Sequence, residues 1–152
     1  MKRLTGIVFA VCTLLHAAGV MANPYTPTLA NGSASIERFD LTDNLYVIEI
    51  SCTAKSDGTL SNIISGWNID GILYEVETDP GSPAPQANYD LTLVTGGIDV
   101  MGGNLANRHT TTTERVRPAV AEPTIMGPLT LTTTGNNVNG AQFVVRIYIK
   151  KQ

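Results

Sequence analysis

The sequence has few of the residues that most catalytic and metal sites require. It contains two cysteines and two histidines in 152 residues, and Cys12 and His16 lie in an N-terminal segment that we expect to be removed. Only Cys52 and His109 then remain. Zinc sites use three or four such ligands, and a single cysteine forms no intrachain disulfide. No nucleophile elbow accompanies His109, so we interpret it as a solvated loop residue.

Charge is also scarce in this chain. Charged residues make up 15% of the sequence, whereas about 25% is typical of globular domains. Without Lys2 and Arg3, the count of Lys and Arg falls from 10 to 8 against 13 Asp and Glu, a net charge of −5. The only adjacent basic pair that remains is Lys150–Lys151. An acidic domain without basic clusters argues against nucleic acid as a partner.

Residues 1–22 have the layout of a secretory signal peptide. Lys2 and Arg3 precede an apolar run from Leu4 to Val20, and Val20-Met21-Ala22 ends the run with residues that suit a signal peptidase. A histidine and two glycines make the run marginal as a membrane span, so no membrane contact is expected once the leader is removed. The alternative is that Met21 is the true start and that the residues upstream of it are a mis-called N-terminal extension.

Residues 23–35 are interpreted as an extended N-terminal arm, which precedes a domain spanning residues 36–152. The arm carries Pro24, Pro27 and the turn-forming pair Asn31-Gly32. Such an arm either wraps a neighbouring subunit or is a poorly ordered terminus. Asn31-Gly32-Ser33 also matches the glycosylation pattern, which has little weight without a eukaryotic secretory context.

Apolar residues alternate with polar ones along several stretches, as is typical of half-buried strands. In Leu45–Thr53 we expect Tyr46, Ile48, Ile50 and Cys52 to face the core. The last strand has the cleanest pattern, with an inward row of Phe143, Val145, Ile147 and Ile149. Its other face, with Val144, Arg146 and Tyr148, is either solvated or a partner surface. Further strands are expected at Ile36–Leu41, Thr59–Ile69, Ile72–Thr78, Tyr89–Val94, Glu114–Val120 and Leu129–Thr134.

The centre of the domain is expected to contain Ile72–Thr78 and Tyr89–Val94. Asp79–Asn88 joins them with three prolines, which exclude both helix and ladder strand. Alternation in the first strand places Ile72, Tyr74 and Val76 on one face and Leu73, Glu75 and Glu77 on the other. Alternation in the second places Tyr89, Leu91 and Leu93 on one face.

Turn signals separate these strands at intervals of about eight to fifteen residues. They include Asp43-Asn44, Lys55–Gly58, a glycine-rich stretch from Thr95 to Asn107, a loop at Ala121–Pro128, and Gly135–Gly140. This pattern predicts an all-β fold: a single antiparallel β-sandwich, Ig-like or jelly-roll-like, with about eight strands and a short helical turn near residues 98–106.

No catalytic, cofactor-binding or metal-binding residue is predicted, and no cofactor is expected. Glu75 and Glu77 share a strand face as a glycosidase pair could, but we interpret them as a solvated face. Trp67, the only tryptophan, is assigned to core packing, with a carbohydrate platform as the alternative. The carboxylates near turns, which match no calcium loop, are Asp79, Asp90 and Asp99.

Several stretches of the chain resemble, in order, a family of small structural proteins of tailed bacteriophages. They are Gly71–Gly81 (GILYEVETDPG), Pro85–Leu93 (PQANYDLTL), Ile98–Asn107 (IDVMGGNLAN), Gly127–Leu131 (GPLTL) and the strand Phe143–Ile149. The resemblance covers roughly Leu45 to Lys150. It implies a non-enzymatic virion component, such as a head decoration, a head fibre or a tail-associated β-domain. The leader departs from the family, because a phage protein assembled in the cytoplasm needs no export.

Two functions therefore stay open. The first is a structural component of a bacteriophage virion, located in the particle, which contacts other virion subunits and forms a homo-oligomer. The alternative is a secreted or periplasmic β-sandwich module that binds glycan or a surface assembly. Neighbouring genes would separate them: capsid, portal or tail genes favour the first, and a host secretion locus favours the second.

We predict that the mature chain begins at Asn23 or Met21, because the leader is either cleaved or not translated. Intact-mass measurement of the soluble, folded protein checks this. Retention of Met1 would contradict both interpretations of residues 1–22.

Overall fold

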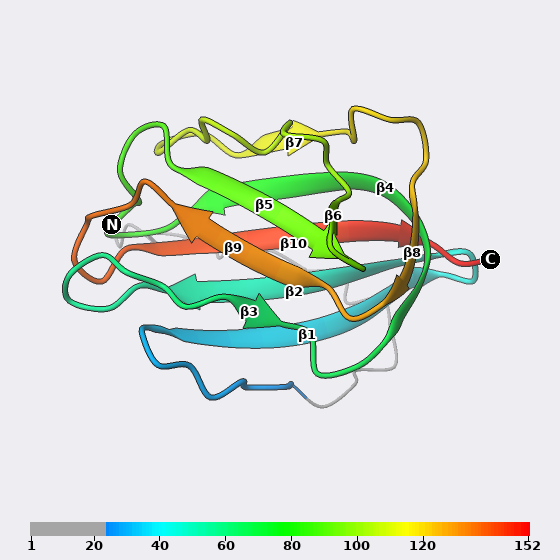
Figure 1. Cartoon of the computed structure of the whole chain (residues 1–152), viewed down its shortest axis with the longest axis horizontal. Coiled ribbons are helices and arrows are strands. Elements are labelled where there is room, and N and C mark those ends of the chain that lie inside the picture. Colours follow the sequence, from blue (N-terminus) through cyan, green and yellow to red (C-terminus); the bar gives the residue numbers. More distant parts are fainter. Residues whose placement is uncertain (1–23) are drawn as a thin grey trace, which may run out of the picture.

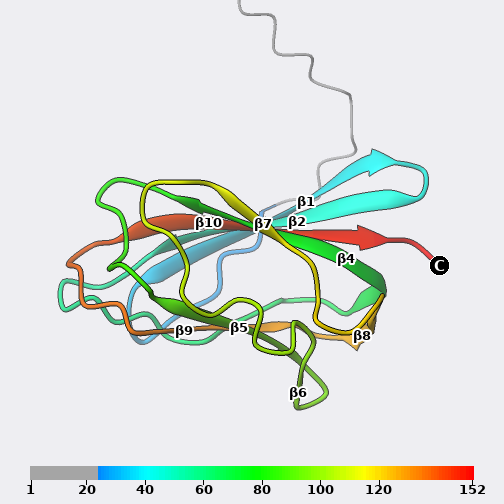
Figure 2. The same ribbon diagram turned by 90° about the horizontal axis from the view of Figure 1, so that it is seen from above.

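The computed structural model describes residues 24–152, which form two antiparallel β-sheets packed face to face (Figures 1 and 2). The larger sheet has six strands, in the order β1-β2-β10-β4-β7 with β8 also paired to β4. The smaller sheet has four, in the order β3-β9-β5-β6. The strands are β1 Ser33–Thr42, β2 Leu45–Thr53, β3 Ile63–Ile64, β4 Ile69–Pro80, β5 Asp90–Thr95, β6 Ile98–Asp99, β7 Glu114–Val116, β8 Thr124–Gly127, β9 Thr130–Thr134 and β10 Gln142–Lys150.

This architecture confirms the predicted all-β sandwich. Ten strands lie within residues 24–152, where about eight were predicted, and two of them, β3 and β6, have only two residues each. Where a short helical turn was predicted, residues 98–106 form successive tight turns and no helix; Gly102, Asn104 and Ala106 each donate a backbone hydrogen bond to the residue three positions earlier. The glycines of this stretch, Gly96, Gly97, Gly102 and Gly103, all have positive φ, a conformation that glycine adopts without steric cost.

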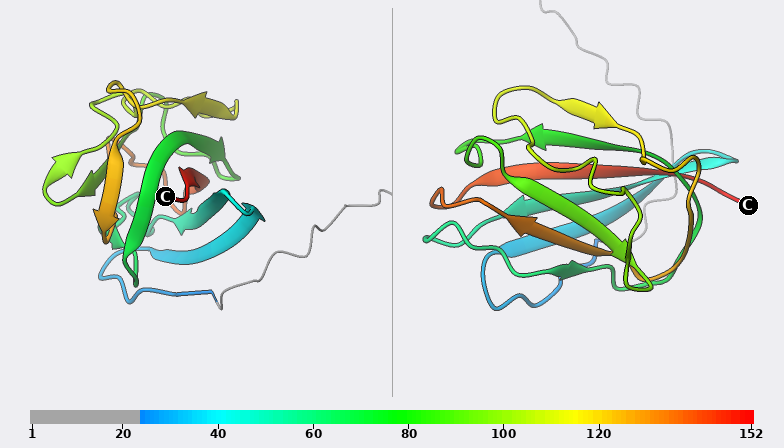
Figure 3. Two further views of the ribbon diagram at one scale, coloured as in Figure 1. Left: turned by 90° about the vertical axis from the view of Figure 1, so that its right-hand side faces the viewer. Right: turned by 45° about the horizontal axis from the view of Figure 1, so that its top comes forward.

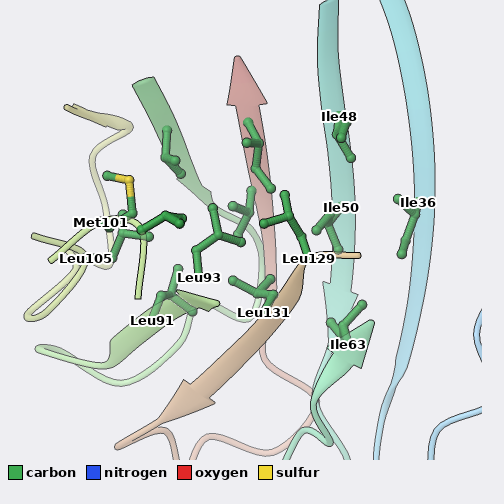
Figure 4. Packing of buried hydrophobic residues seen from close by; sticks show 14 of the residues in the cluster. Ile36, Ile48, Ile50, Ile63, Leu91, Leu93, Met101, Leu105, Leu129 and Leu131 are labelled. Atoms are coloured by element: carbon green, nitrogen blue, oxygen red, sulfur yellow. The ribbon is translucent and has the colours of Figure 1, made fainter. Parts of the chain in front are cut away.

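Strand β10 lies in the middle of the larger sheet, between β2 and β4. Its predicted inward row is confirmed, because Phe143, Val145, Ile147 and Ile149 are all buried. The inward faces of β2 and β5 are confirmed as well. Figure 4 shows Leu91, Leu93 and Leu131 of the smaller sheet packing against the buried residues of the larger sheet. Cys52 is buried in the same core, and burial raises the pKa of its thiol.

The predicted alternation in β4 is wrong at one point. Leu73 and Val76, expected on opposite faces, are both fully buried. The reason is a bulge: Ile149 of β10 pairs with Leu73 and Tyr148 pairs with Glu75, so Tyr74 is an extra residue on β4. One extra residue reverses the facing of every position beyond it. Both halves of β4 therefore present aliphatic side chains to the core.

The two strands expected at the centre belong to different sheets, so Gly81–Tyr89 crosses from the larger sheet to the smaller one. Two other expectations are also corrected. Thr59–Ile69 contains only the short strand β3, and the loop expected at Ala121–Pro128 contains β8. Strand β8 pairs with the beginning of β4, as Ile125 does with Gly71 (Figure 3, left). The edge position predicted for Glu114–Val120 is confirmed for β7.

The N-terminal residues within the described range lie against the sandwich. Strand β1 begins at Ser33, inside the range expected for the arm, and the backbones of Tyr25 and Ile36 exchange two hydrogen bonds of 2.8 Å. The leader prediction concerns residues outside the described range. Within residues 24–152 there is no helix with the length and apolar character needed to cross a bilayer.

We predict that Phe143→Ala lowers the free energy of unfolding by about 3–5 kcal/mol, the range for truncating a buried aromatic side chain. Phe143 is 1% exposed, and its ring lies 5.5 Å from that of Tyr89. Urea melts measure the loss. Val144→Ala, on the outer face of the same strand, is the control and should lose about 1 kcal/mol or less. Equal, small losses of unfolding free energy for both variants would show that β10 does not contribute to the core.

Candidate binding surfaces

A row of charged side chains crosses the outer face of the larger sheet. The strand registers place Glu37, Glu49, Arg146, Glu77 and Arg115 next to one another on β1, β2, β10, β4 and β7. Each position is separated from the next by one strand spacing, so the side chains are within reach of their neighbours. The sequence suggested alternation on each strand but not which charges the registers would bring together.

Arg146 is at the centre of this row and is not simply solvated. Its Nε donates to Glu49 at 2.7 Å, and its Nη1 donates to Glu77 at 2.6 Å and to Asp79 at 3.4 Å. Burial by itself would lower the pKa of the guanidinium, but the bonds to Glu49 and Glu77 outweigh it and raise the pKa. Arg146 therefore holds three carboxylates from two neighbouring strands.

The interpretation of Glu75 and Glu77 as a solvated pair is wrong for Glu77, which is only 6% exposed. One of its oxygens accepts from Arg146, and the other accepts from Arg115 Nε at 2.6 Å. Glu75 lies 3.5 Å from the same Arg115. Both oxygens of Glu77 are therefore engaged by arginines, so Glu75 and Glu77 belong to a network of ion pairs.

The two half-buried tyrosine rings of the larger sheet, those of Tyr74 and Tyr148, are covered by cations. Arg115 lies over the ring of Tyr148, 5.4 Å from its centroid. Arg117 and Lys150 both lie 4.7 Å from the centroid of Tyr74. Cation–π contacts of this kind stabilise the pair and occupy the ring face. A ligand that stacks on the covered face of either ring would have to displace these cations.

The other single residues considered from the sequence have structural roles. Trp67 is half-buried against the core, as expected, with Tyr25 packed edge-on at 5.9 Å. Asp90 accepts a bond from the Asn107 amide, and Asp99 accepts from the amides of Met101 and Gly103. His109 is exposed. No group of three or more His, Cys, Asp or Glu residues within 24–152 is placed to hold a metal ion.

A second surface has the opposite character. Ile98, Val120 and Met126 are 69%, 71% and 74% exposed, although all three are large apolar residues. Val120 lines two adjacent depressions, of about 280 and 450 Å³. The smaller is lined mainly by β6 and residues 120–124, and the larger by Tyr74 and residues 117–122. Met126 lies two positions after Thr124, which lines the smaller depression, and both are exposed on the same side of β8. We call this region, with Ile98, Val120, Met126 and both depressions, the Val120 surface.

The backbone of the Val120 surface is fixed by contacts between distant segments. Asn104 Nδ2 donates to the carbonyl of Arg117 at 3.0 Å, and the Ala119 amide donates to Met101 at 3.2 Å. At the other end, the Leu73 amide donates to Pro123 at 2.9 Å. These bonds hold residues 117–123 onto the turns after β6 and onto β4. The apolar side chains of the Val120 surface are therefore exposed on a backbone that is already fixed before any partner binds.

No protein-family model matches the chain, and no curated protein matches it. A solved structure with some similarity is a low-affinity xylan-binding module from the xylanolytic gut symbiont Roseburia intestinalis. It shares 15% sequence identity with this chain, with a TM-score of 0.36, and the alignment covers 88% of this chain and 97% of that one. That comparison assigns neither a family nor a ligand to the present protein.

We predict that Arg146→Ala lowers the free energy of unfolding by about 1–3 kcal/mol, because it leaves three half-buried or buried carboxylates facing one another without their cation. Lys55→Ala removes the same charge from an exposed turn and should change stability by about 0.5 kcal/mol or less. Urea melts of both variants measure the difference. Equal effects would show that Arg146 is no more than a solvated side chain.

Proposed function

We propose that this chain is a non-enzymatic β-sandwich that acts by binding other protein subunits, and that the Val120 surface makes the contact. The observation that carries the proposal is the exposure of Ile98, Val120 and Met126 on a backbone fixed by its own hydrogen bonds. Clustered apolar side chains in water favour association. A preformed surface binds with a smaller entropic cost than one that must become ordered.

A resemblance in the sequence supports a particular kind of assembly, a bacteriophage particle. The resemblance of Gly71–Asn107 and the later strands to small structural proteins of tailed bacteriophages supports a virion, with this chain as a head decoration, head fibre or tail-associated subunit. A homo-oligomer within that particle is part of the proposal. Mass spectrometry of purified particles tests whether this chain is a virion component, because its peptides must then be present in fixed proportion to the capsid or tail proteins.

A second candidate is a secreted or periplasmic module that binds glycan. The outer face of the larger sheet favours it, because Tyr148 lies beside the hydrogen-bonding groups of Arg146, Glu77 and Arg115. Binding sites for small polar ligands combine rings with a few fixed polar groups in this way. Affinity electrophoresis in gels containing soluble polysaccharides tests it. Retardation of the wild type that is lost in Tyr148→Ala would favour the glycan function.

We predict that Val120→Asp abolishes association of the protein, with itself or with purified particles, because a buried charge replaces an apolar contact. Stability should change by about 0.5 kcal/mol or less, since Val120 is exposed in the free chain. Sedimentation velocity and co-sedimentation with particles measure association.

The matched control for that experiment is Ile64→Asp. Ile64 is 52% exposed and lies on β3, at the opposite edge of the smaller sheet from β6, so this variant introduces the same charge at an apolar residue away from the Val120 surface. It should associate like the wild type. If Val120→Asp associates normally, or if both variants fail equally, the Val120 surface is not the contact.

A further inference from the structure

Arg117, at the edge of the Val120 surface, carries a charge that no neighbouring carboxylate offsets. Among the arginines of residues 24–152, Arg38, Arg108, Arg115 and Arg146 each have a carboxylate oxygen within 4.0 Å, and Arg117 has none. Its one side-chain hydrogen bond runs from Nη2 to the hydroxyl of Tyr74, at 2.6 Å. A guanidinium has five N–H donors, so most of its capacity is unused by protein groups.

The position of this guanidinium is fixed rather than free. The Tyr74 hydroxyl accepts from it while the Tyr74 ring lies 4.7 Å beneath it, and Asn104 holds the Arg117 carbonyl. Tyr74 is itself positioned by the bulge in β4. An arginine that is already held in place loses less side-chain entropy when it binds an anion.

Other charges around the larger depression cancel. Lys150 donates to Glu122 at 2.9 Å, and this bond lowers the pKa of the Glu122 carboxyl. Tyr74, Arg117 and Glu122 all line the depression of about 450 Å³. Lys150 and Glu122 together contribute no net charge there, so the net charge at the larger depression is the positive charge of Arg117. The larger depression adjoins the smaller, apolar one, because Val120 lines both.

The two depressions together fit a polypeptide of particular chemistry. A carboxylate can form two parallel hydrogen bonds with an arginine fork, and the bond strengthens as water is excluded. The adjoining depression offers the apolar side chains of Ile98, Val100 and Val120. We propose that a partner polypeptide places an aspartate or glutamate on Arg117 and an apolar side chain, a residue or a few residues away, in the adjoining depression. This inference rests on the proposed function, because it names the chemistry of the partner at the same surface.

A random linear peptide library displayed on beads tests the proposal with immobilised wild-type protein. We expect the selected peptides to be enriched in Asp or Glu close to Leu, Ile, Val or Phe. For one selected peptide, Arg117→Gln should weaken binding by about tenfold to a hundredfold, and Asp→Asn in that peptide should do the same. Combining both changes should add little more, because each removes the same contact.

Two variants complete the design. Lys55→Gln removes one positive charge from a distant turn and should bind the peptide like the wild type, which excludes a general charge effect. Arg117→Lys keeps the charge but not the fork, and should bind more tightly than Arg117→Gln and more weakly than the wild type. Thermal melts of the three variants should match that of the wild type, because both positions are exposed.

The outcomes separate this inference from the proposed function. Selection of apolar peptides without acidic enrichment, or an undiminished affinity in Arg117→Gln, would overturn the role of Arg117 while the Val120 surface stands. If the wild type selects no peptide and Val120→Asp also leaves association unchanged, the proposed function fails together with this inference.

Discussion

The backbone pairing of β10 with β2 on one side and β4 on the other is the constraint on which the rest of the structure depends. It brings residues 45–53 and 72–80 to the two flanks of residues 142–150, although long stretches of sequence separate them. The inward row of β10 is fully buried against the smaller sheet. The same registers fix the outward row, so Arg146 lies between Glu49 and Glu77. The pairing of β10 with β2 and β4 thus determines both the core on one side of the sheet and the charged face on the other.

The bulge in β4 connects this core to the candidate binding surface. It returns Leu73 to the core and leaves Tyr74 half-buried, where Arg117 and Lys150 lie over its ring. Strand β8 pairs with β4 just before this point, and the Leu73 amide binds the Pro123 carbonyl. Residues 117–124 are therefore positioned by the irregular end of β4. A perfectly regular strand would turn Tyr74 and Leu73 to other faces.

Much of this fold could be predicted from the sequence, because burial on one face leaves a period of two. Strands β2, β5 and β10 were predicted with their correct inward faces. The bulge was missed because one extra residue leaves no mark when apolar residues occur on both sides of it. Strand β8 was missed because four residues between two prolines, the last of them a glycine, are too few to show a periodicity. The Val120 surface depends on hydrogen bonds such as Asn104 to Arg117, between segments that no local pattern relates.

The two surfaces differ in what a ligand would have to displace. On the outer face of the larger sheet, Glu77 is held by two arginines at 2.6 Å each, and Arg115 covers Tyr148. A ligand that used these groups would first break charge-assisted bonds, and each broken bond would subtract from its affinity. At the Val120 surface, the exposed side chains of Ile98, Val120 and Met126 contribute no hydrogen bond that a partner must replace. Arg117 there has no carboxylate within 4.0 Å among the described residues. A partner with an acidic residue beside an apolar one would remove apolar area from water and give Arg117 a counter-charge, so both the hydrophobic and the electrostatic contributions would favour its binding there.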